Sequence, residues 1–279
     1  MYLLLNLLKN EHALPWMIHR LLYLMTLGWL LIVPCLVSSD TLKLVFSDVE
    51  VSPYQMGNGS ALMNPPGIAV DIIVKAAKNL GHTVHFIRVP NKRVLLTVQS
   101  GKADGAFIFS YKPEREQYGL YPMKNGKPDS DLRIASMSYY FYALGINNMK
   151  WDGKKLTGGS LKVGANSGYS IVADLKKMGF KVEEAKTTQQ NFQKLKSNRF
   201  GVVAAQSITA DAYLKFEQNT AVERLEPPLK TKDYFLILSH QFYKKNPDKA
   251  RLLWQEIALA RDYIAAQKSV KYLKDTSIN

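Results

Sequence analysis

Cysteine is almost absent from this sequence. Cys35 is the only one among 279 residues, and it lies within the first 39. A chain that begins at Asp40 would contain no disulfide, so its hydrophobic core alone would have to stabilise it. Hydrophobic residues make up 47% of the sequence and charged residues 22%, as in an ordinary globular protein. The length is sufficient for one or two domains.

Residues with catalytic or metal-binding chemistry are also few. After residue 39 the histidines are His82, His85 and His240, and none has the HExxH spacing of a zinc site. The sequence contains no GxSxG nucleophile elbow and no P-loop. We therefore expect no cofactor, no metal site and no enzymatic activity.

Clustered charge is missing as well. The formal net charge is +14. Without Lys9, Glu11 and Arg20, which precede Asp40, 35 basic and 22 acidic residues remain, a net charge of +13. These residues are spread along the chain without an Arg-rich arm or zinc-finger spacing, so we do not expect a nucleic-acid partner. Attraction to an anionic membrane or cell-wall surface, or simply a solvated basic surface, explains the charge.

The one markedly apolar stretch lies near the start of the chain. From Met17 the sequence reads MIHRLLYLMTLGWLLIVPCLVSS, with a short basic region, an apolar stretch over 21–33 and small residues at 37–39. This pattern predicts a secretory signal peptide over residues 1–39, cleaved near Ser39, and hence a periplasmic protein. Residues 1–16 lie outside the pattern, which makes Met17 an alternative start. An uncleaved anchor would need a longer apolar run, of about 20 residues. Lipidation of Cys35 is not expected, because no small residue precedes it.

The remaining chain predicts two α/β halves of the same order. We expect strands at 41–46, 83–89 and 105–110 with helices at 69–80 and 91–100, then strands at 161–165, 180–184 and 201–206 with helices at 168–179 and 188–197. The order β-α-β-α-β implies a parallel sheet with right-handed crossovers. Gly81-His82-Thr83-Val84 matches Gly179-Phe180-Lys181-Val182, and Ser100-Gly101-Lys102 matches Ser197-Asn198-Arg199. A general likeness among α/β units is the alternative explanation for this echo.

Two extended segments, 136–144 and 231–238, flank the second half and would cross between lobes as a hinge. Two helices are expected after Asn246-Pro247, the last ending near Lys274. We therefore predict a first lobe from 40–141, a second lobe from 142–230, and a return crossing with C-terminal helices, 231–279, that completes the first lobe. The carboxyl ends of the strands in both lobes would meet at one cleft, where ligands of such sheets bind.

Three motifs carry a family resemblance: GIAVDI at 67–72, SGKADGAF leading to PER at 113–115, and VGANSG at 163–168. In their order and spacing the chain resembles the periplasmic solute-binding proteins of family 3, the type that serves polar amino-acid ABC transporters. The resemblance implies a two-lobed α/β fold, the periplasmic binding protein type II fold. It also implies capture of a small polar ligand in the cleft, a membrane permease as partner, and a monomer. The alternatives are a ligand-sensing partner of a membrane receptor, or a dehydratase-like enzyme with Glu50 as its cleft carboxylate.

The resemblance implies that Arg115 grips a carboxylate of the ligand with its guanidinium fork, helped by the Ser110 hydroxyl. Pro113 is placed to begin a helix, which would put Arg115 in the first turn, where the helix dipole favours anions. The alternative is a surface arginine paired with Glu114 or Glu116.

Further candidates lie on both lobes. Ser167 and Gly168 precede a predicted helix, and their N–H groups with the Ser167 hydroxyl would make a second anion cradle; ordinary N-capping is the alternative. Arg93 is either another anion contact or part of an exposed helix face. Tyr54 and Phe109 either stack on the ligand or pack within a lobe.

The chain departs from the family at one position that matters for the ligand. Amino-acid binders of the family place an acidic residue after the last strand of the second lobe, where it holds the α-ammonium group. Here Gln206 occupies that position, and Asp211 lies one turn into the next helix. An α-amino acid would need Glu50 or Asp48 for its ammonium group, and a ligand without an ammonium group is the alternative.

Overall fold

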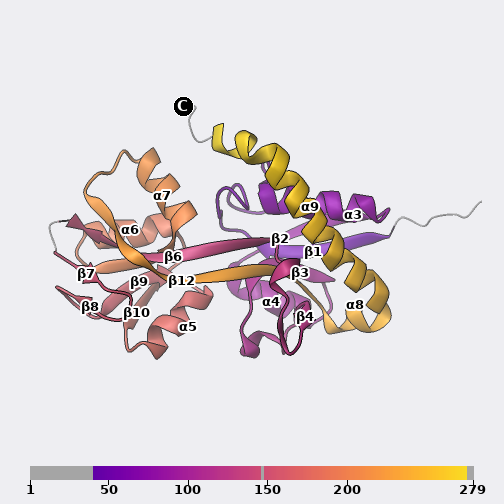
Figure 1. Ribbon diagram of the computed structural model, residues 1–279, viewed down its shortest axis with the longest axis horizontal. Helices are drawn as coiled ribbons and strands as arrows, with labels where there is room; N and C mark the ends of the chain where they lie inside the picture. Colours follow the sequence, from indigo (N-terminus) through magenta and orange to yellow (C-terminus); the bar gives the residue numbers. More distant parts are fainter. Residues whose placement is uncertain (1–39, 146–147, 275–279) are drawn as a thin grey trace, which may run out of the picture. The chain divides into compact units, whose positions relative to one another are not determined.

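The computed structural model describes residues 40–145 and 148–274, with side chains as far as residue 266 (Figure 1). The predicted signal peptide, with Cys35, lies outside the described residues. Among the helices of this part of the chain, none combines the length and the apolar character needed to cross a membrane.

The centre of the fold is an eight-stranded sheet of order β10-β9-β11-β6-β12-β3-β1-β2. Its strands are β1 (Thr41–Ser47), β2 (Thr83–Val89), β3 (Gly105–Ser110), β6 (Ala135–Leu144), β9 (Lys162–Asn166), β10 (Lys181–Ala185), β11 (Val202–Gln206) and β12 (Val222–Leu238). The first strand group, β1–β3, and the second strand group, β9–β11, are each internally parallel. β6 and β12 lie between the groups and pair antiparallel with each other and with their outer neighbours.

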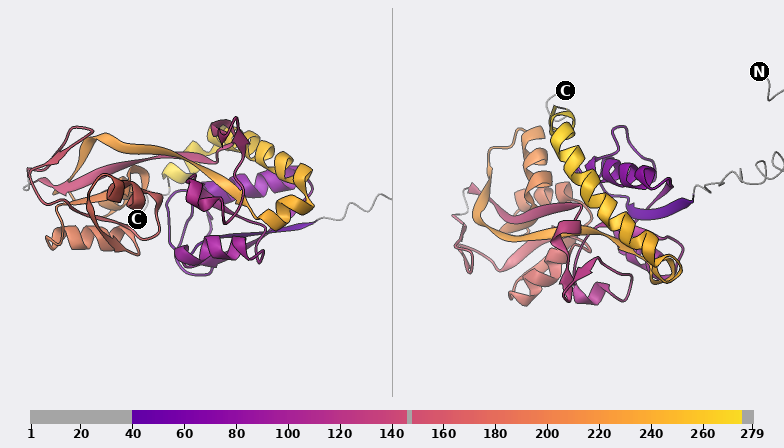
Figure 2. Two further views of the ribbon diagram at one scale, coloured as in Figure 1. Left: turned by 90° about the horizontal axis from the view of Figure 1, so that it is seen from below. Right: turned by 45° about the vertical axis from the view of Figure 1, so that its right-hand side comes forward.

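Helices cover both faces of each strand group (Figure 2). They are α3 (Ile68–Asn79), α4 (Asn91–Gln99), α5 (Ser170–Lys177), α6 (Thr188–Lys196), α7 (Ser207–Phe216), α8 (His240–Lys245) and α9 (Pro247–Lys274). α3 and α9 bury their apolar faces with one face of β1, whereas α4 packs on the opposite face through Val94 and Val98. On the second strand group, α5 covers one face and α6 with α7 the other.

α3 and α9 lie side by side although they are distant in sequence (Figure 1). The Asn79 amide donates a hydrogen bond of 3.0 Å to the Glu256 carboxylate, across 177 residues of chain. α9 turns Leu253, Ile257 and Ala260 inward, and all three are completely buried. The last helix thus completes the core of the first strand group.

The predicted order of strands and helices is confirmed in both halves. The similarity between the two halves extends to the ends of their helices. Gly81 and Gly179 follow α3 and α5 with φ of 74° and 88°, a left-handed conformation that glycine adopts without strain. Gly101 and Asn198 follow α4 and α6 in the same region, with φ of 71° and 54°. The matched positions therefore end corresponding helices in the same way.

Two local predictions are wrong. Pro113 begins only a 3-10 turn, η2 (Pro113–Arg115), because the chain soon pairs with β12 through a bridge between Leu120 and Leu238. The two helices expected after Asn246 are one helix, α9, since no glycine or proline interrupts residues 248–274. Shorter elements complete the fold: η3 (Ser130–Leu132) and the hairpins β4 (Met123–Lys124) with β5 (Lys127–Pro128) and β7 (Lys150–Trp151) with β8 (Leu156–Thr157).

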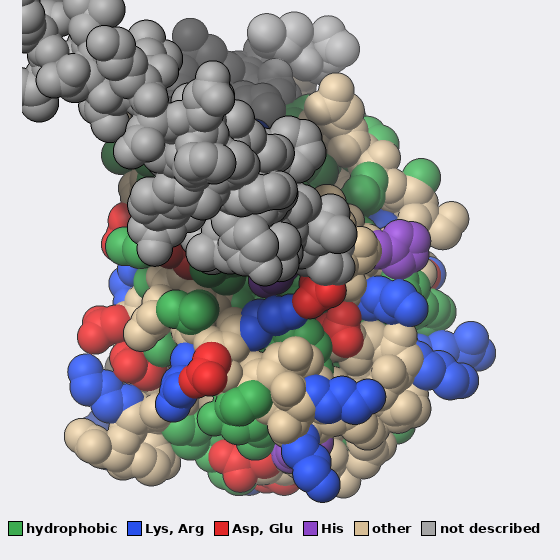
Figure 3. Space-filling view, turned by 90° about the vertical axis from the view of Figure 1, so that its right-hand side faces the viewer, with side chains coloured by type: hydrophobic (Ala, Val, Ile, Leu, Met, Phe, Trp, Pro, Cys, Tyr) green, Lys and Arg blue, Asp and Glu red, His purple; other side chains and the backbone are tan. Residues whose placement is uncertain are grey.

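Charged side chains of both signs are mixed on one face of the described part of the chain. On the face seen in Figure 3, lysine and arginine side chains are interspersed with acidic and hydrophobic ones rather than gathered in one patch. Many basic groups are paired, as in the contacts of Lys162 and Lys194 with Glu183, at 2.6 and 2.9 Å. This distribution agrees with a solvated basic surface.

Candidate functional site

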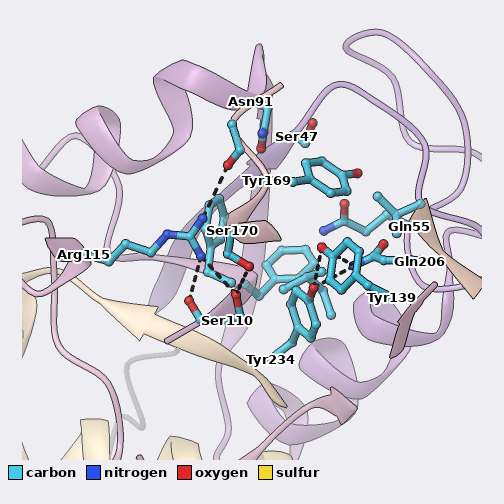
Figure 4. A pocket seen from close by; sticks show the side chains of 15 residues that line it. Ser47, Gln55, Asn91, Ser110, Arg115, Tyr139, Tyr169, Ser170, Gln206 and Tyr234 are labelled. Atoms are coloured by element: carbon cyan, nitrogen blue, oxygen red, sulfur yellow. Dashed lines mark hydrogen bonds between the residues drawn. The ribbon is translucent and has the colours of Figure 1, made fainter. Parts of the chain in front are cut away.

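A pocket lies where the two strand groups meet the crossing strands β6 and β12 (Figure 4). Its free volume is about 40 Å³, far below the several hundred Å³ typical of ligand pockets. A bound ligand would therefore have to displace some of the contacts that fill it. The lining residues are Ser47, Val51, Gln55, Asn91, Phe107, Ile108, Phe109, Ser110, Arg115, Tyr139, Gly168, Tyr169, Ser170, Gln206 and Tyr234.

Arg115 carries the charge of the pocket and is held there by neutral partners. Its guanidinium donates to the Ser110 carbonyl at 2.7 Å and to the Ser110 hydroxyl at 3.3 Å. It lies 5.3 Å from the centre of the Phe109 ring, within the range of a cation–π contact. Within the described residues Arg115 has no ion pair with Glu114 or Glu116. Its charge is thus not neutralised by a neighbouring carboxylate.

The helix-dipole explanation for Arg115 is wrong. Because η2 is a single 3-10 turn, it provides no helix N-terminus beside the guanidinium. Arg115 is oriented instead by the end of β3, since the Ser110 carbonyl that accepts from it also accepts from the Tyr121 hydroxyl, at 2.9 Å.

Hydrogen bonds cross the pocket directly, from residues beside the first strand group to residues beside the second. The Ser110 hydroxyl donates to the Ser170 hydroxyl at 2.8 Å, and Arg115 donates to the Gly168 carbonyl at 3.4 Å. At the start of α4, the Asn91 amide donates to the Ser167 carbonyl at 3.0 Å. The pocket is therefore closed by bonds that a ligand could replace with its own.

The predicted amide cradle is already occupied. The Ser167 N–H donates to the Ala185 carbonyl at 2.9 Å, and the Gly168 N–H donates to the Glu184 carboxylate at 3.3 Å. Ser167 is not an N-cap either, because Tyr169 stands at the N-cap position of α5. Gly168 still lines the pocket, with its carbonyl near Arg115.

Neutral groups form the end of the pocket opposite Arg115 (Figure 4). The Gln206 amide donates to the hydroxyls of Tyr234 and Tyr139 at 2.7 and 3.2 Å, and these two hydroxyls are 2.9 Å apart. Burial raises the pKa of Tyr139 and of Tyr234 well above the usual value for tyrosine, and raises the pKa of Tyr169 to about 12. All three phenols are uncharged at neutral pH, so this end offers hydrogen bonds without charge.

The structure brings most of the predicted site residues together and leaves three outside. Those that line the pocket are Phe109, Ser110, Arg115, Gly168 and Gln206. Tyr54 instead packs against the core beside α3, Arg93 is exposed on α4, and Ser167 lies just outside the lining. Ligand contact by any of them remains a prediction.

The sequence predictions missed the tyrosines. Tyr139 and Tyr234 lie on β6 and β12, the segments predicted as crossings, and Tyr169 follows Gly168 directly. The sequence did contain a signal for two of them. Each predicted crossing segment contains a tyrosine, and both segments were expected to pass the predicted cleft. Gln55, only 2% exposed, lies in an irregular loop with no comparable signal.

The described residues show no group of three or more His, Cys, Asp or Glu side chains that could hold a metal ion. What the pocket can do is bind an anionic group at Arg115 and a neutral hydrogen-bonding group at Gln206 and the tyrosines.

Several solved structures that are similar to this chain are amino-acid-binding proteins. An ancestral arginine-binding protein bound to glutamine is 22% identical, with a TM-score of 0.58 over 84% of this chain and 95% of that chain. The GluR0 ligand-binding core in complex with L-glutamate is 14% identical, with a TM-score of 0.63 over 86% of this chain and 98% of that chain. This is the two-lobed α/β fold of periplasmic binding proteins. The substrate-binding protein of an amino acid ABC transporter shares it, at 13% identity and a TM-score of 0.58 over 84% and 96% of the two chains.

No protein-family model matches the chain, and no curated protein matches its sequence. The predicted fold is thus confirmed by structural similarity.

Proposed function

We propose that the protein is an exported solute-binding protein that captures a small carboxylate-bearing ligand between its lobes. The observation that carries the proposal is Arg115, a cation on the wall of an otherwise uncharged pocket. A carboxylate entering there would gain charge-assisted hydrogen bonds without displacing an existing ion pair. The fold, shared with amino-acid-binding proteins, supports a binding role rather than catalysis.

The lobes of this proposal follow the sequence prediction. Residues 40–141 and 231–279 would form the first lobe and residues 142–230 the second, with β6 and β12 as the crossings. In the sheet, β6 and β12 lie between the two strand groups, which supports this division. Delivery to an ABC permease, a periplasmic location and a monomeric state complete the proposal.

Thermal unfolding of the purified protein in the presence of amino acids, other carboxylic acids and oligopeptides tests the function. A ligand at 100 times its dissociation constant stabilises the folded state by about 2.7 kcal/mol, which shifts the unfolding midpoint measurably. We expect at least one carboxylate ligand to produce such a shift. The Arg115→Ala variant should lose about 2 kcal/mol of binding energy, roughly 30-fold in affinity.

The matched control is Arg251→Ala, which removes an exposed arginine of α9 that does not line the pocket. The control should bind as tightly as the unaltered protein. Equal weakening by both substitutions would indicate general electrostatic attraction instead of a specific anchor. If the ligand shifts the unfolding midpoint of Arg115→Ala as much as that of the unaltered protein, the proposal loses its basis.

A further inference from the structure

The charge of the pocket is unbalanced. Among the described residues that line it, Arg115 is the one charged side chain, and no aspartate or glutamate is present. An α-amino acid carries an ammonium group beside its carboxylate. Both charges would lose water on entering this pocket, but only the carboxylate would meet an opposite charge.

The carboxylates near the pocket are committed to other partners. Glu50 accepts from the Gly57 N–H at 2.6 Å, and Glu184 accepts from the Gly168 N–H at 3.3 Å. Asp211 accepts from the Tyr142 hydroxyl at 2.6 Å and from Arg224 at 2.8 Å. None of the three lines the pocket.

Asp48 has one carboxylate oxygen without a hydrogen-bond partner within the described residues. That oxygen exposes less than 1 Å² to solvent, and Asp48 does not line the pocket. The other oxygen lies 3.4 Å from Lys186. Neither Asp48 nor Glu50 lines the pocket, so neither provides there the counter-charge that an ammonium group requires.

The groups opposite Arg115 suit a different ligand. Gln206 is 5% exposed and engages the hydroxyls of Tyr139 and Tyr234. Amide and phenol groups both donate and accept hydrogen bonds, so they can satisfy a ligand hydroxyl, carbonyl or amide. They carry no charge with which to offset the desolvation of a cation.

We propose that the pocket selects a monocarboxylate with no ammonium group, such as a 2-hydroxy acid, against the corresponding α-amino acid. This inference rests on the proposed function, since it assigns the ligand class of the same site. Gln206 is its specificity-determining residue. Two of the solved structures described above hold glutamine and L-glutamate, so the inference separates this chain from them.

Isothermal titration calorimetry with matched ligand pairs tests the inference on the unaltered protein. Each pair shares a side chain and differs at one group: L-lactate and L-alanine, L-2-hydroxyisocaproate and L-leucine, L-3-phenyllactate and L-phenylalanine. We expect the hydroxy acid of the best-fitting pair to bind at least tenfold more tightly than its amino acid. An amino acid that binds as tightly as its hydroxy acid, or more tightly, would overturn the inference.

Substitution at Gln206 gives the second test. Gln206→Glu places a carboxylate at the neutral end and should reverse the preference within each pair by at least tenfold. Gln255→Glu, on an exposed face of α9, is the matched control and should leave the preference unchanged. If Gln206→Glu folds and leaves the preference unchanged, the role given to Gln206 is wrong. The titrations of the unaltered protein decide the inference even if this variant fails to fold.

The two proposals fail in different ways. Tighter binding of an amino acid that is lost in Arg115→Ala would leave the proposed function standing and remove the inference. Absence of binding by both members of every pair would overturn the inference, and absence of a shift with every carboxylate of the thermal-unfolding screen would overturn the proposed function.

Discussion

Ile108 has an unusual backbone conformation at the pocket wall. Its φ of 61° lies in the left-handed region, which a β-branched side chain rarely adopts. On β12, the register opposite β3 shifts between Phe235 and Ile237, so β3 contains one extra residue. As a result Phe107 packs on the α3 side of the sheet and Phe109 on the α4 side, although a regular strand would point both the same way. This β-bulge re-aims the end of β3, which carries Ser110 and positions Arg115.

Because of the bulge, we expect glycine to be better tolerated than alanine at position 108. Within a regular strand, a glycine makes the protein less stable than an alanine does, by about 0.5–1 kcal/mol. At a left-handed position alanine is instead penalised, by about 1 kcal/mol. We therefore expect Ile108→Gly to be more stable than Ile108→Ala in urea unfolding. The usual order, with alanine more stable, would contradict the strained conformation.

Asp174 on α5 is the acidic member of a charged cluster beside the pocket. It pairs with Lys112, which follows β3, at 3.1 Å, and also with Lys232 of β12. The exposed fractions of the Lys112, Asp174 and Lys232 side chains are 15%, 17% and 8%. The cluster thus joins elements of both strand groups where little water reaches it. Burial alone would raise the pKa of Asp174, but the hydrogen bonds and charges of Lys232 and Lys112 outweigh burial, and the pKa is lowered.

Asp174→Asn should lower the free energy of unfolding by about 3 kcal/mol, because it leaves Lys232 buried without its counter-charge. Lys232→Met in the same background should restore much of the loss, and a double-mutant cycle in urea measures this coupling. Asp248→Asn is the control, since its side chain is 79% exposed and such pairs contribute less than about 1 kcal/mol. Equal losses of unfolding free energy in Asp174→Asn and Asp248→Asn would contradict this role of the buried cluster.

The lowered pKa of Asp174 also sets a direction with pH. A carboxyl whose pKa is lowered on folding stabilises the protein fully at a pH above the pKa that it has in the unfolded chain, near 3.8. That stabilisation is lost as the pH falls through the pKa of the carboxyl in the folded protein. We expect Asp174→Asn to flatten the acid limb of the stability profile below about pH 4, measured by urea midpoints across pH. An unchanged acid limb would place the acid sensitivity at other carboxyls.

Short-range patterns predicted the elements well, and long-range pairing explains what they missed. Helix stripes and terminal glycines such as Gly81 and Gly179 lie within single segments, so the sequence shows them directly. The helix expected at Pro113 failed because a contact with β12, more than 100 residues away, decides the path of the chain. Arg115 and Gln206 were found through the family resemblance. Tyr139 and Tyr234 share the pocket only because β6 pairs with β12, which no local pattern encodes.

Considered as a whole, the molecule places its two strand groups on either side of β6 and β12. The proposed lobes should therefore differ in how they respond to a defect in one of them. Ile257 of α9 is fully buried against the first strand group, whereas Leu259 on the same helix is 61% exposed.

Ile257→Ala should destabilise the protein by about 2–4 kcal/mol, and the control Leu259→Ala by less than about 0.5 kcal/mol. In hydrogen exchange we expect Ile257→Ala to accelerate amides of α3 and β1 more than those of α5 and β9. Uniform acceleration throughout would indicate one cooperative unit and contradict the division into lobes.

The pairing of α3 with α9 has a consequence for the order in which the protein is made. α3 emerges well before the helix that covers its apolar face, because Glu256 of α9 lies 177 positions after Asn79. Contacts between such distant segments form slowly, because a long loop must close first. The apolar face of α3 therefore stays uncovered by α9 while the intervening chain is synthesised. During that interval the segment from β1 to α3 lacks part of its core.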